Sequence, residues 1–206
     1  MLIKICGITR LEDAEAAVAA GAGAIGFVFW PKSPRFVDPH RAATIAAMLP
    51  PLVTVVGVFV NQPLDDVNGV ASLVRLGAVQ LHGDETPEFA AAVSRPVIKA
   101  VSVGGVDPRA WPARIRLLLD VHDPVARGGT GRTIDWTAAA DLAAQREILL
   151  AGGLTPDNVA DAVARVRPFG IDVSSGVERA PGIKDHQRLR ALFEAMDDCG
   201  PITTRS

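Results

Sequence analysis

The chain has 206 residues, of which 49% are hydrophobic and 21% charged, a composition that is ordinary for a globular protein and excludes a disordered or collagen-like chain. Its 21 basic and 23 acidic residues give a net charge of -2 without a basic run, so we expect no nucleic-acid partner. Cys6 and Cys199 are too few for a disulfide framework, and they suit a reducing compartment.

The apolar segments are too short to direct the chain into or across a membrane. The N-terminus is apolar only briefly, and Lys4 interrupts it, so it lacks the continuous apolar core of a signal peptide. The longest apolar stretches, around 22–30 and 52–60, fall far below the roughly 20 residues that span a bilayer. We therefore expect a cytoplasmic protein with no membrane partner.

Short apolar runs rich in strand-forming residues alternate with stretches of helical spacing along the chain. The expected strands are Leu2–Cys6, Ala24–Trp30, Val53–Val60, Ala78–His82, Val97–Val103, Leu117–Asp120, Ile148–Ala151 and Gly170–Val173. The expected helices are Leu11–Ala20, Pro39–Leu49, Leu64–Arg75, Pro87–Ser94, Trp136–Gln145, Pro156–Val166 and His186–Met196, with a weaker helix over Pro108–Ile115 that Pro112 interrupts.

Four of these helices carry a start signal in which an N-cap residue precedes a proline. The pairs are Asp38-Pro39, Thr86-Pro87, Asp107-Pro108 and Thr155-Pro156. The side chain of an N-cap residue accepts hydrogen bonds from the first free amides of the helix, and proline at the first helical position has no amide hydrogen to lose.

Eight strand–helix units follow one another with short connections and no linker. They predict a single α/β domain with a parallel sheet over residues 1–206, ending in a polar tail at 197–206. An open doubly wound sheet and a closed (β/α)8 (TIM) barrel both fit this alternation. The count of eight favours the barrel, and strands that are apolar on both faces suit a sheet covered by helices.

Polar and thiol side chains collect where the expected strands end, which is where a barrel carries its chemistry. They are Cys6 after the first strand, Arg35 after the second, His82 after the fourth, Asp120 after the sixth and Asp172 on the eighth. Side chains alternate along a strand, so Lys4 points inward one layer below Cys6. Because the eighth strand neighbours the first in a closed barrel, Asp172 comes within reach of both.

The loops after the seventh and eighth strands contain the residues expected to bind phosphate. They are Gly152 and Gly153 in the first loop and Ser174, Ser175 and Gly176 in the second. Barrels often bind phosphate between these two loops through backbone N–H groups, and glycine allows the backbone to approach the anion closely. Two ordinary glycine turns are the alternative.

Each remaining candidate has a structural and a functional interpretation. Cys6 is either a small core residue or, if the nearby Lys4 lowers its pKa, a thiolate that acts as base or nucleophile. Asp120 follows three leucines and is either a loop cap or an acid whose burial favours the protonated form. Arg35 is either a surface arginine or the ligand of a substrate carboxylate, and His82 is either a core histidine or part of the site.

Together these strand ends resemble the phosphoribosylanthranilate isomerases. The matching stretches are KICGITRLEDA (4–14), GAIGFVFWPKSPR (23–35), VGVFVN (56–61), VQLHGDE (79–85), LLLD (117–120), GGTGRTIDW (128–136), LAGGLTPDNV (150–159) and DVSSGVERAPGIKD (172–185). They run in order from the first strand to the last helix. Residues 121–127 match nothing in the family pattern that we can identify.

The resemblance implies a (β/α)8 barrel, without metal or organic cofactor, in tryptophan biosynthesis. Such enzymes convert N-(5-phosphoribosyl)anthranilate to 1-(2-carboxyphenylamino)-1-deoxyribulose 5-phosphate by an Amadori rearrangement. By matching motif positions, Cys6 is the general base, Asp120 is the general acid, and Arg35 holds the anthranilate carboxylate. His82 and Asp172 are further candidates for contacts with the substrate. A monomer is expected, and a homodimer stays open.

Two other functions remain open from the sequence. One is another phosphate-binding barrel enzyme, such as an indole-glycerol-phosphate synthase or a Schiff-base aldolase, which would act through Lys4 or Lys99. The other is a non-catalytic phosphosugar-binding protein, which would use the phosphate loops but leave Cys6 and Asp120 without a task.

Overall fold

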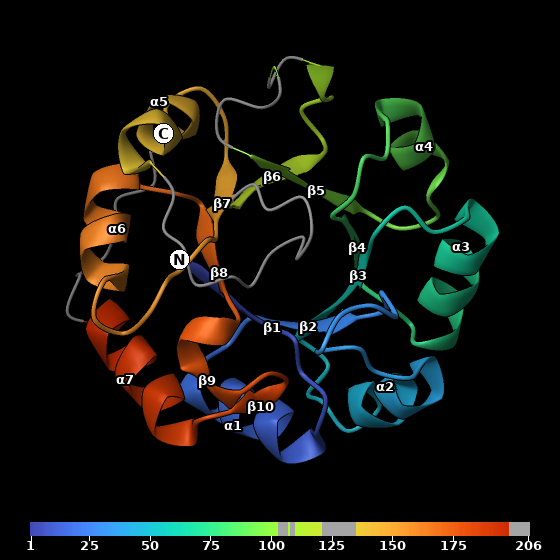
Figure 1. Cartoon of the computed structure of the whole chain (residues 1–206), viewed down its shortest axis with the longest axis horizontal. Coiled ribbons are helices and arrows are strands. Elements are labelled where there is room, and N and C mark those ends of the chain that lie inside the picture. Colours follow the sequence, from blue (N-terminus) through green and yellow to red (C-terminus); the bar gives the residue numbers. More distant parts are fainter. Residues whose placement is uncertain (103–106, 108–109, 121–134, 198–206) are drawn as a thin grey trace.

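The computed structural model describes residues 1–102, 107, 110–120 and 135–197. Parallel strands β1 to β8 close into a barrel in chain order, and helices surround it (Figure 1). The strands are β1 (Leu2–Cys6), β2 (Ala24–Val28), β3 (Thr54–Phe59), β4 (Ala78–Leu81), β5 (Val97–Ser102), β6 (Arg116–Asp120), β7 (Ile148–Leu150) and β8 (Gly170–Val173). The helices are α1 (Leu11–Ala20), α2 (Pro39–Ala46), α3 (Leu64–Leu73), α4 (Pro87–Ala92), α5 (Trp136–Ala143), α6 (Val159–Val166) and α7 (His186–Asp197).

The barrel closes between its first and last strands. Strand β1 pairs with β2 on one side and with β8 on the other, and Lys4 is the partner of Asp172 in the second pairing. The closed barrel is therefore confirmed and the open sheet is excluded. Several expected strands end one or two residues too late, because apolar residues such as Phe29, Val60 and Ala151 continue the apolar run into the loops at the carboxyl end.

Two of the predicted N-caps are confirmed. The side chain of Asp38 accepts from the amides of His40 and Arg41, and that of Thr86 accepts from the amide of Phe89. The cap at Thr155 is wrong, since α6 begins at Val159 and residues 156–158 form a turn. The pair Asp107-Pro108 lies partly outside the described residues.

The weak helix expected over Pro108–Ile115 does not form as an α-helix in its described part, where only Ala110 is helical, in a 3-10 turn closed on the carbonyl of Asp107. Residues 111–115 make bends and turns, closed by a hydrogen bond from the amide of Ile115 to the carbonyl of Pro112. Proline has no amide hydrogen for a helical ladder, which explains why the chain turns here. Residues 121–133 and the polar tail lie outside the described part, apart from Asp197, which ends α7.

A short hairpin between β8 and α7 was not predicted. The chain passes through a 3-10 turn, η2 (Ser175–Val177), and then through two antiparallel strands, β9 (Glu178–Ala180) and β10 (Ile183–Lys184). Figure 1 shows this hairpin next to α1. It brings charged residues from the last loop back to the end of the first strand.

The main core lies between the barrel and its helices, and the barrel interior holds smaller clusters. Ala24, Val56 and Ala78 pack together at one level of the interior, and Cys6, Val28 and Val58 pack together at another. The buried polar side chains of the interior include Lys4 and Gln80, each 1% exposed. Among the described residues, no helix has the length and apolar character needed to cross a bilayer.

Candidate active site

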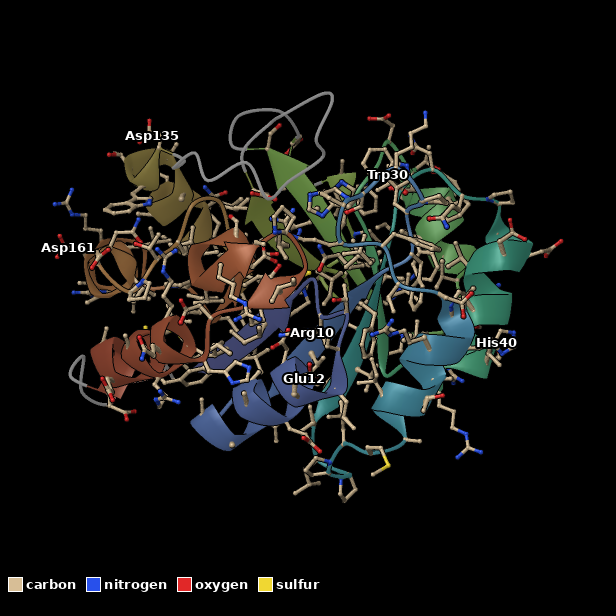
Figure 2. All side chains as sticks on the ribbon, turned by 60° about the horizontal axis from the view of Figure 1, so that its bottom comes forward. Arg10, Glu12, Trp30, His40, Asp135 and Asp161 are labelled. Atoms are coloured by element: carbon tan, nitrogen blue, oxygen red, sulfur yellow. The ribbon has the colours of Figure 1, made fainter. Side chains whose placement is uncertain are left out.

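One pocket of about 450 Å³ opens at the carboxyl end of the barrel. Its lining includes all the residues predicted for the site, namely Cys6, Arg35, His82, Asp120, Gly152, Gly153, Asp172, Ser174, Ser175 and Gly176. Trp30 also lines it and was not predicted; it lies at the upper end of the molecule in Figure 2. The structure thus brings the candidates together, while their chemical roles stay predictions.

Cys6 ends β1 and lies above a buried ion pair. Nζ of Lys4 donates to Oδ1 of Asp172 at 2.8 Å, and the two residues are 1% and 8% exposed. Asp172 therefore holds the lysine charged beneath the thiol, and the pKa of Lys4 is raised although burial alone would lower it. The inward direction predicted for Lys4 and its proximity to Asp172 are both confirmed.

The pKa expected for Cys6 was wrong in direction. Burial raises the pKa of the thiol, and the charges of Lys4 and Lys184 lower it by less than burial raises it. The sequence showed the cation but not the depth of the thiol, which is 7% exposed. In the free protein the thiol is therefore protonated at neutral pH.

Asp120 ends β6, and its carboxylate faces His82 from β4. Nε2 of His82 lies 3.3 Å from Oδ2 of Asp120. The other ring nitrogen of His82, which directly follows β4, is Nδ1, and it lies 2.9 Å from Nε2 of Gln80 on β4. Sequence reasoning placed the histidine and the aspartate at the site but missed this glutamine, whose alternation with His82 along β4 was the available signal.

Arg35 reaches the pocket from the loop after β2, and a carboxylate already holds it. Its Nε and Nη2 donate to Oε1 and Oε2 of Glu178 at 3.0 and 2.7 Å. Within the described part of the chain, only Nη1 is left without a hydrogen bond. Glu178 therefore holds one side of the guanidinium, and Nη1 is left to bind a ligand, so the role predicted for Arg35 stays a prediction.

Glu178 and Lys184 connect this arginine to the first strand. Nζ of Lys184 donates to Oε1 of Glu178 at 2.8 Å and to the carbonyl of Cys6 at 2.6 Å. Burial raises the pKa of Glu178, but the hydrogen bond and charge of Arg35 and those of Lys184 outweigh it, so the pKa is lowered. Both residues belong to a stretch that matches the family, but their pairing depends on the hairpin.

The two predicted phosphate loops lie in direct contact. A Cβ at Gly176 would come within 1.8 Å of the carbonyl oxygen of Leu154, so only glycine fits there. Gly152 and Gly153 have φ angles of 82° and 67°, in the region that favours glycine. The amides of Gly152, Gly153, Ser175 and Gly176 make no hydrogen bond to the described part of the chain, so they can donate to an anion.

Two further side chains shape this anion site. Oγ of Ser174 is buried and has no hydrogen-bond partner among the described residues. Asn158, which was not predicted, donates to the carbonyl of Gly153 and accepts from the amide of Thr155 at 3.0 and 2.8 Å. It holds the first loop in shape from the start of α6.

Comparisons with known proteins agree with one another. A family model described as N-(5'-phosphoribosyl)anthranilate (PRA) isomerase matches residues 3–195. The N-(5'-phosphoribosyl)anthranilate isomerase of Pelobacter propionicus is 50% identical over 206 residues, which cover 98% of this chain and 99% of the relative.

Solved structures give the same match. The crystal structure of phosphoribosyl anthranilate isomerase from Thermus thermophilus matches with a TM-score of 0.88 at 45% identity, over 96% of this chain and 99% of that one. A crystal structure of such an enzyme in complex with reduced 1-(o-carboxyphenylamino)-1-deoxyribulose 5-phosphate matches with a TM-score of 0.83 at 42% identity, over 96% and 100% of the two chains.

Proposed function

The chain belongs to the N-(5'-phosphoribosyl)anthranilate isomerase family, and on that premise we propose that Cys6 and Asp120 are the base and the acid of its reaction. The activity is the isomerisation of phosphoribosylanthranilate in tryptophan biosynthesis. The observation that supports these roles is the order of the barrel, in which β7 and β8 lie between β6 and β1. The phosphate loops therefore lie between the two residues.

A substrate anchored by its phosphate at these loops extends its ribose between Asp120 and Cys6. The amides of the two loops and Oγ of Ser174 bind the phosphate oxygens. The two chemical groups then face different atoms of one sugar, as an acid and a base acting on one substrate require. Binding energy from the phosphate, which does not react, positions the reacting atoms.

The Amadori rearrangement needs four proton movements, which these two groups supply. Asp120 donates a proton to the ring oxygen as the bond from that oxygen to C1 breaks, which leaves a protonated imine. Cys6, as the thiolate, then takes the proton from C2 and leaves an enolamine. The thiol returns a proton to C1 while Asp120, now ionised, takes the proton of the 2-hydroxyl, which gives the ketone and restores both groups.

The thiol must lose its proton before it acts, and the bound substrate favours this. The pKa of Cys6 is raised in the free protein. A cationic imine beside the thiol lowers that pKa, because an opposite charge favours the thiolate. Lys4, held charged by Asp172 below the thiol, acts in the same direction.

The free Nη1 of Arg35 binds the anthranilate carboxylate. The arginine lies in the loop after β2, across the pocket mouth from the loop after β7. Glu178 occupies the other two nitrogens and fixes the plane of the guanidinium. The carboxylate thus meets one aligned charge-assisted donor at a cost of little side-chain entropy.

The lysine-based alternative finds less support. Nζ of Lys99 donates to the carbonyl of Gly83 and to Glu85, and Lys99 is not among the pocket-lining residues. Lys4 is ion-paired and 1% exposed. Borohydride reduction in the presence of substrate traps a lysine adduct if either forms a Schiff base, and we expect no adduct.

The decisive experiment is turnover of freshly made phosphoribosylanthranilate, followed fluorimetrically. We expect Cys6→Ser to remain folded and almost inactive at pH 7, because a serine hydroxyl ionises far too weakly to act as a base. Cys199→Ser is the matched control and should keep wild-type activity. Near-normal turnover by Cys6→Ser would remove the thiol from the mechanism.

A monomer stays our expectation for the active protein, and a homodimer is the alternative, since a related isomerase from Thermotoga maritima is described as dimeric. Light scattering at assay concentrations, together with a specific activity that does not change on dilution, tests this. Activity that falls with dilution would show that assembly is needed.

A further inference from the structure

Gln80 is a buried polar residue of the pocket that the reaction described above does not use. It lies on β4, is 1% exposed and lines the pocket. Its Oε1 is buried and has no hydrogen-bond partner in the described part of the chain. A buried acceptor without a partner destabilises a protein, so one kept beside a pocket points to a ligand that satisfies it.

The other end of the amide determines the tautomer of His82. Nε2 of Gln80 can only donate, so Nδ1 of His82, 2.9 Å away, must accept. In a neutral imidazole the proton then resides on Nε2. That nitrogen lies 3.3 Å from Oδ2 of Asp120 and directs its N–H toward the proposed acid.

The chemistry of Oε1 limits what it binds in the substrate. It is an acceptor only, and the phosphate and the carboxylate of the substrate also offer only acceptors at neutral pH. The groups with a hydrogen to donate are the sugar hydroxyls and the anilino nitrogen. Strand β4 lies opposite β8 across the barrel, whereas the anthranilate end of the proposed pose lies toward Arg35 in the loop after β2, so we assign Oε1 to a sugar hydroxyl and not to the anilino nitrogen.

We propose that Gln80 is a positioning residue that fixes His82 as the Nε2–H tautomer beside Asp120 and accepts a hydrogen bond from a sugar hydroxyl through Oε1. This rests on the proposed function for its substrate, but not for the tautomer. The side chain thus links recognition of the sugar to the orientation of Asp120. When a sugar hydroxyl donates to Oε1 of Gln80, Nε2 of the same amide continues to donate to Nδ1 of His82.

The tautomer is measured without substrate. Long-range 1H–15N spectra of the free protein at about pH 8.5, where an ordinary imidazole is neutral, report which ring nitrogen carries the proton. The His82→Asn variant assigns the signal. We expect the Nε2–H form in the wild type and a mixture of tautomers in Gln80→Met, a variant of similar length without hydrogen bonds. A wild type in the Nδ1–H form would overturn the proposal.

Gln80→Glu tests the same control of the His82 tautomer, with the opposite expected result. A carboxylate can only accept, so it draws the proton to Nδ1 and reverses the tautomer. Gln145→Met is the control, because Gln145 is exposed on the outside of the barrel and its side-chain amide donates to the carbonyl of Asp141, away from the pocket lining. Thermal melting confirms that each variant is folded, and the wild-type spectrum decides the matter even if a variant is not.

The hydroxyl contact is tested by binding. We expect Gln80→Met to weaken binding of reduced 1-(o-carboxyphenylamino)-1-deoxyribulose 5-phosphate about tenfold and to leave binding of inorganic phosphate, which has no sugar, unchanged. Equal loss for both ligands, or no loss, would refute the contact. If the wild type did not turn over phosphoribosylanthranilate, the proposed function would fail, while the tautomer result would stand.

Discussion

Replacing Glu178 by glutamine tests how the hairpin after β8 supports the site. The carboxylate accepts from Nη2 of Arg35 at 2.7 Å and from Nζ of Lys184 at 2.8 Å, and it is 7% exposed. Removing one partner of a buried ion pair costs about 3–5 kcal/mol, because the other charge stays buried without compensation. For a chain of this size, that corresponds to a melting temperature about 6–20 °C lower.

The loss should depend on pH in a defined direction. The pKa of Glu178 in the folded protein is lowered, so its contribution to stability is complete above the pKa of the unfolded chain. The contribution disappears as the pH falls through the lowered folded value. We therefore expect wild type and Glu178→Gln to differ most at neutral pH and to converge in acid.

Binding should suffer more than chemistry. Glutamine offers one acceptor oxygen where Glu178 offers two, so the guanidinium of Arg35 loses its two-point contact and its fixed plane. We expect KM to rise about tenfold or more with kcat changed less, because the anthranilate carboxylate is held in both ground and transition states. Arg35→Met should show the same pattern, and the double variant should add little.

Urea unfolding at pH 7 and at a series of acid pH values below the ordinary carboxyl range, together with steady-state kinetics, measures these effects. Glu194→Gln on α7 is the matched control, since that carboxylate is exposed and distant from the pocket lining. A stability loss below about 1 kcal/mol with an unchanged KM would refute the argument, because it would mean that neither cation depends on Glu178.

Three other changes test the site. Asp120→Asn should lower kcat by about 10²–10⁴-fold with little change in KM, because an amide transfers no proton, and turnover within a few-fold of wild type would make Asp120 a loop cap. Alkylation of Cys6 by iodoacetamide should accelerate as the pH rises above the ordinary thiol range, since the pKa of this thiol is raised. Lys4→Met should move the pH of half-maximal alkylation further up, because it removes a charge that lowers this pKa. Mass spectrometry across a pH series measures both effects. Gly176→Ala should weaken phosphate binding in calorimetry, because its Cβ would come within 1.8 Å of the Leu154 carbonyl and push the two loops apart; unchanged affinity would place the anion elsewhere.

The sequence by itself predicted the order of the eight parallel strands and favoured the closed barrel over an open sheet, which the structure then excluded. Apolar runs alternating with helical stretches encode both, because burial of each strand and helix face depends on local periodicity. Strand alternation also predicted the meeting of Lys4 and Asp172, since inward positions follow from parity once neighbouring strands are known. Glycine positions at the two loops pointed correctly to the place where the loops touch.

Only the tertiary structure decided how the polar groups of the pocket are paired. Glu178 reaches Arg35 across 143 positions of sequence, through a hairpin that no local pattern indicated. The direction of the Cys6 pKa shift depends on how completely the surrounding strands exclude water. The lack of a hydrogen-bond partner for Oε1 of Gln80 among the described residues depends on which side chains the fold places around it. Burial and hydrogen-bond partners are properties of atoms distant in the chain, so they exist only once the barrel has closed.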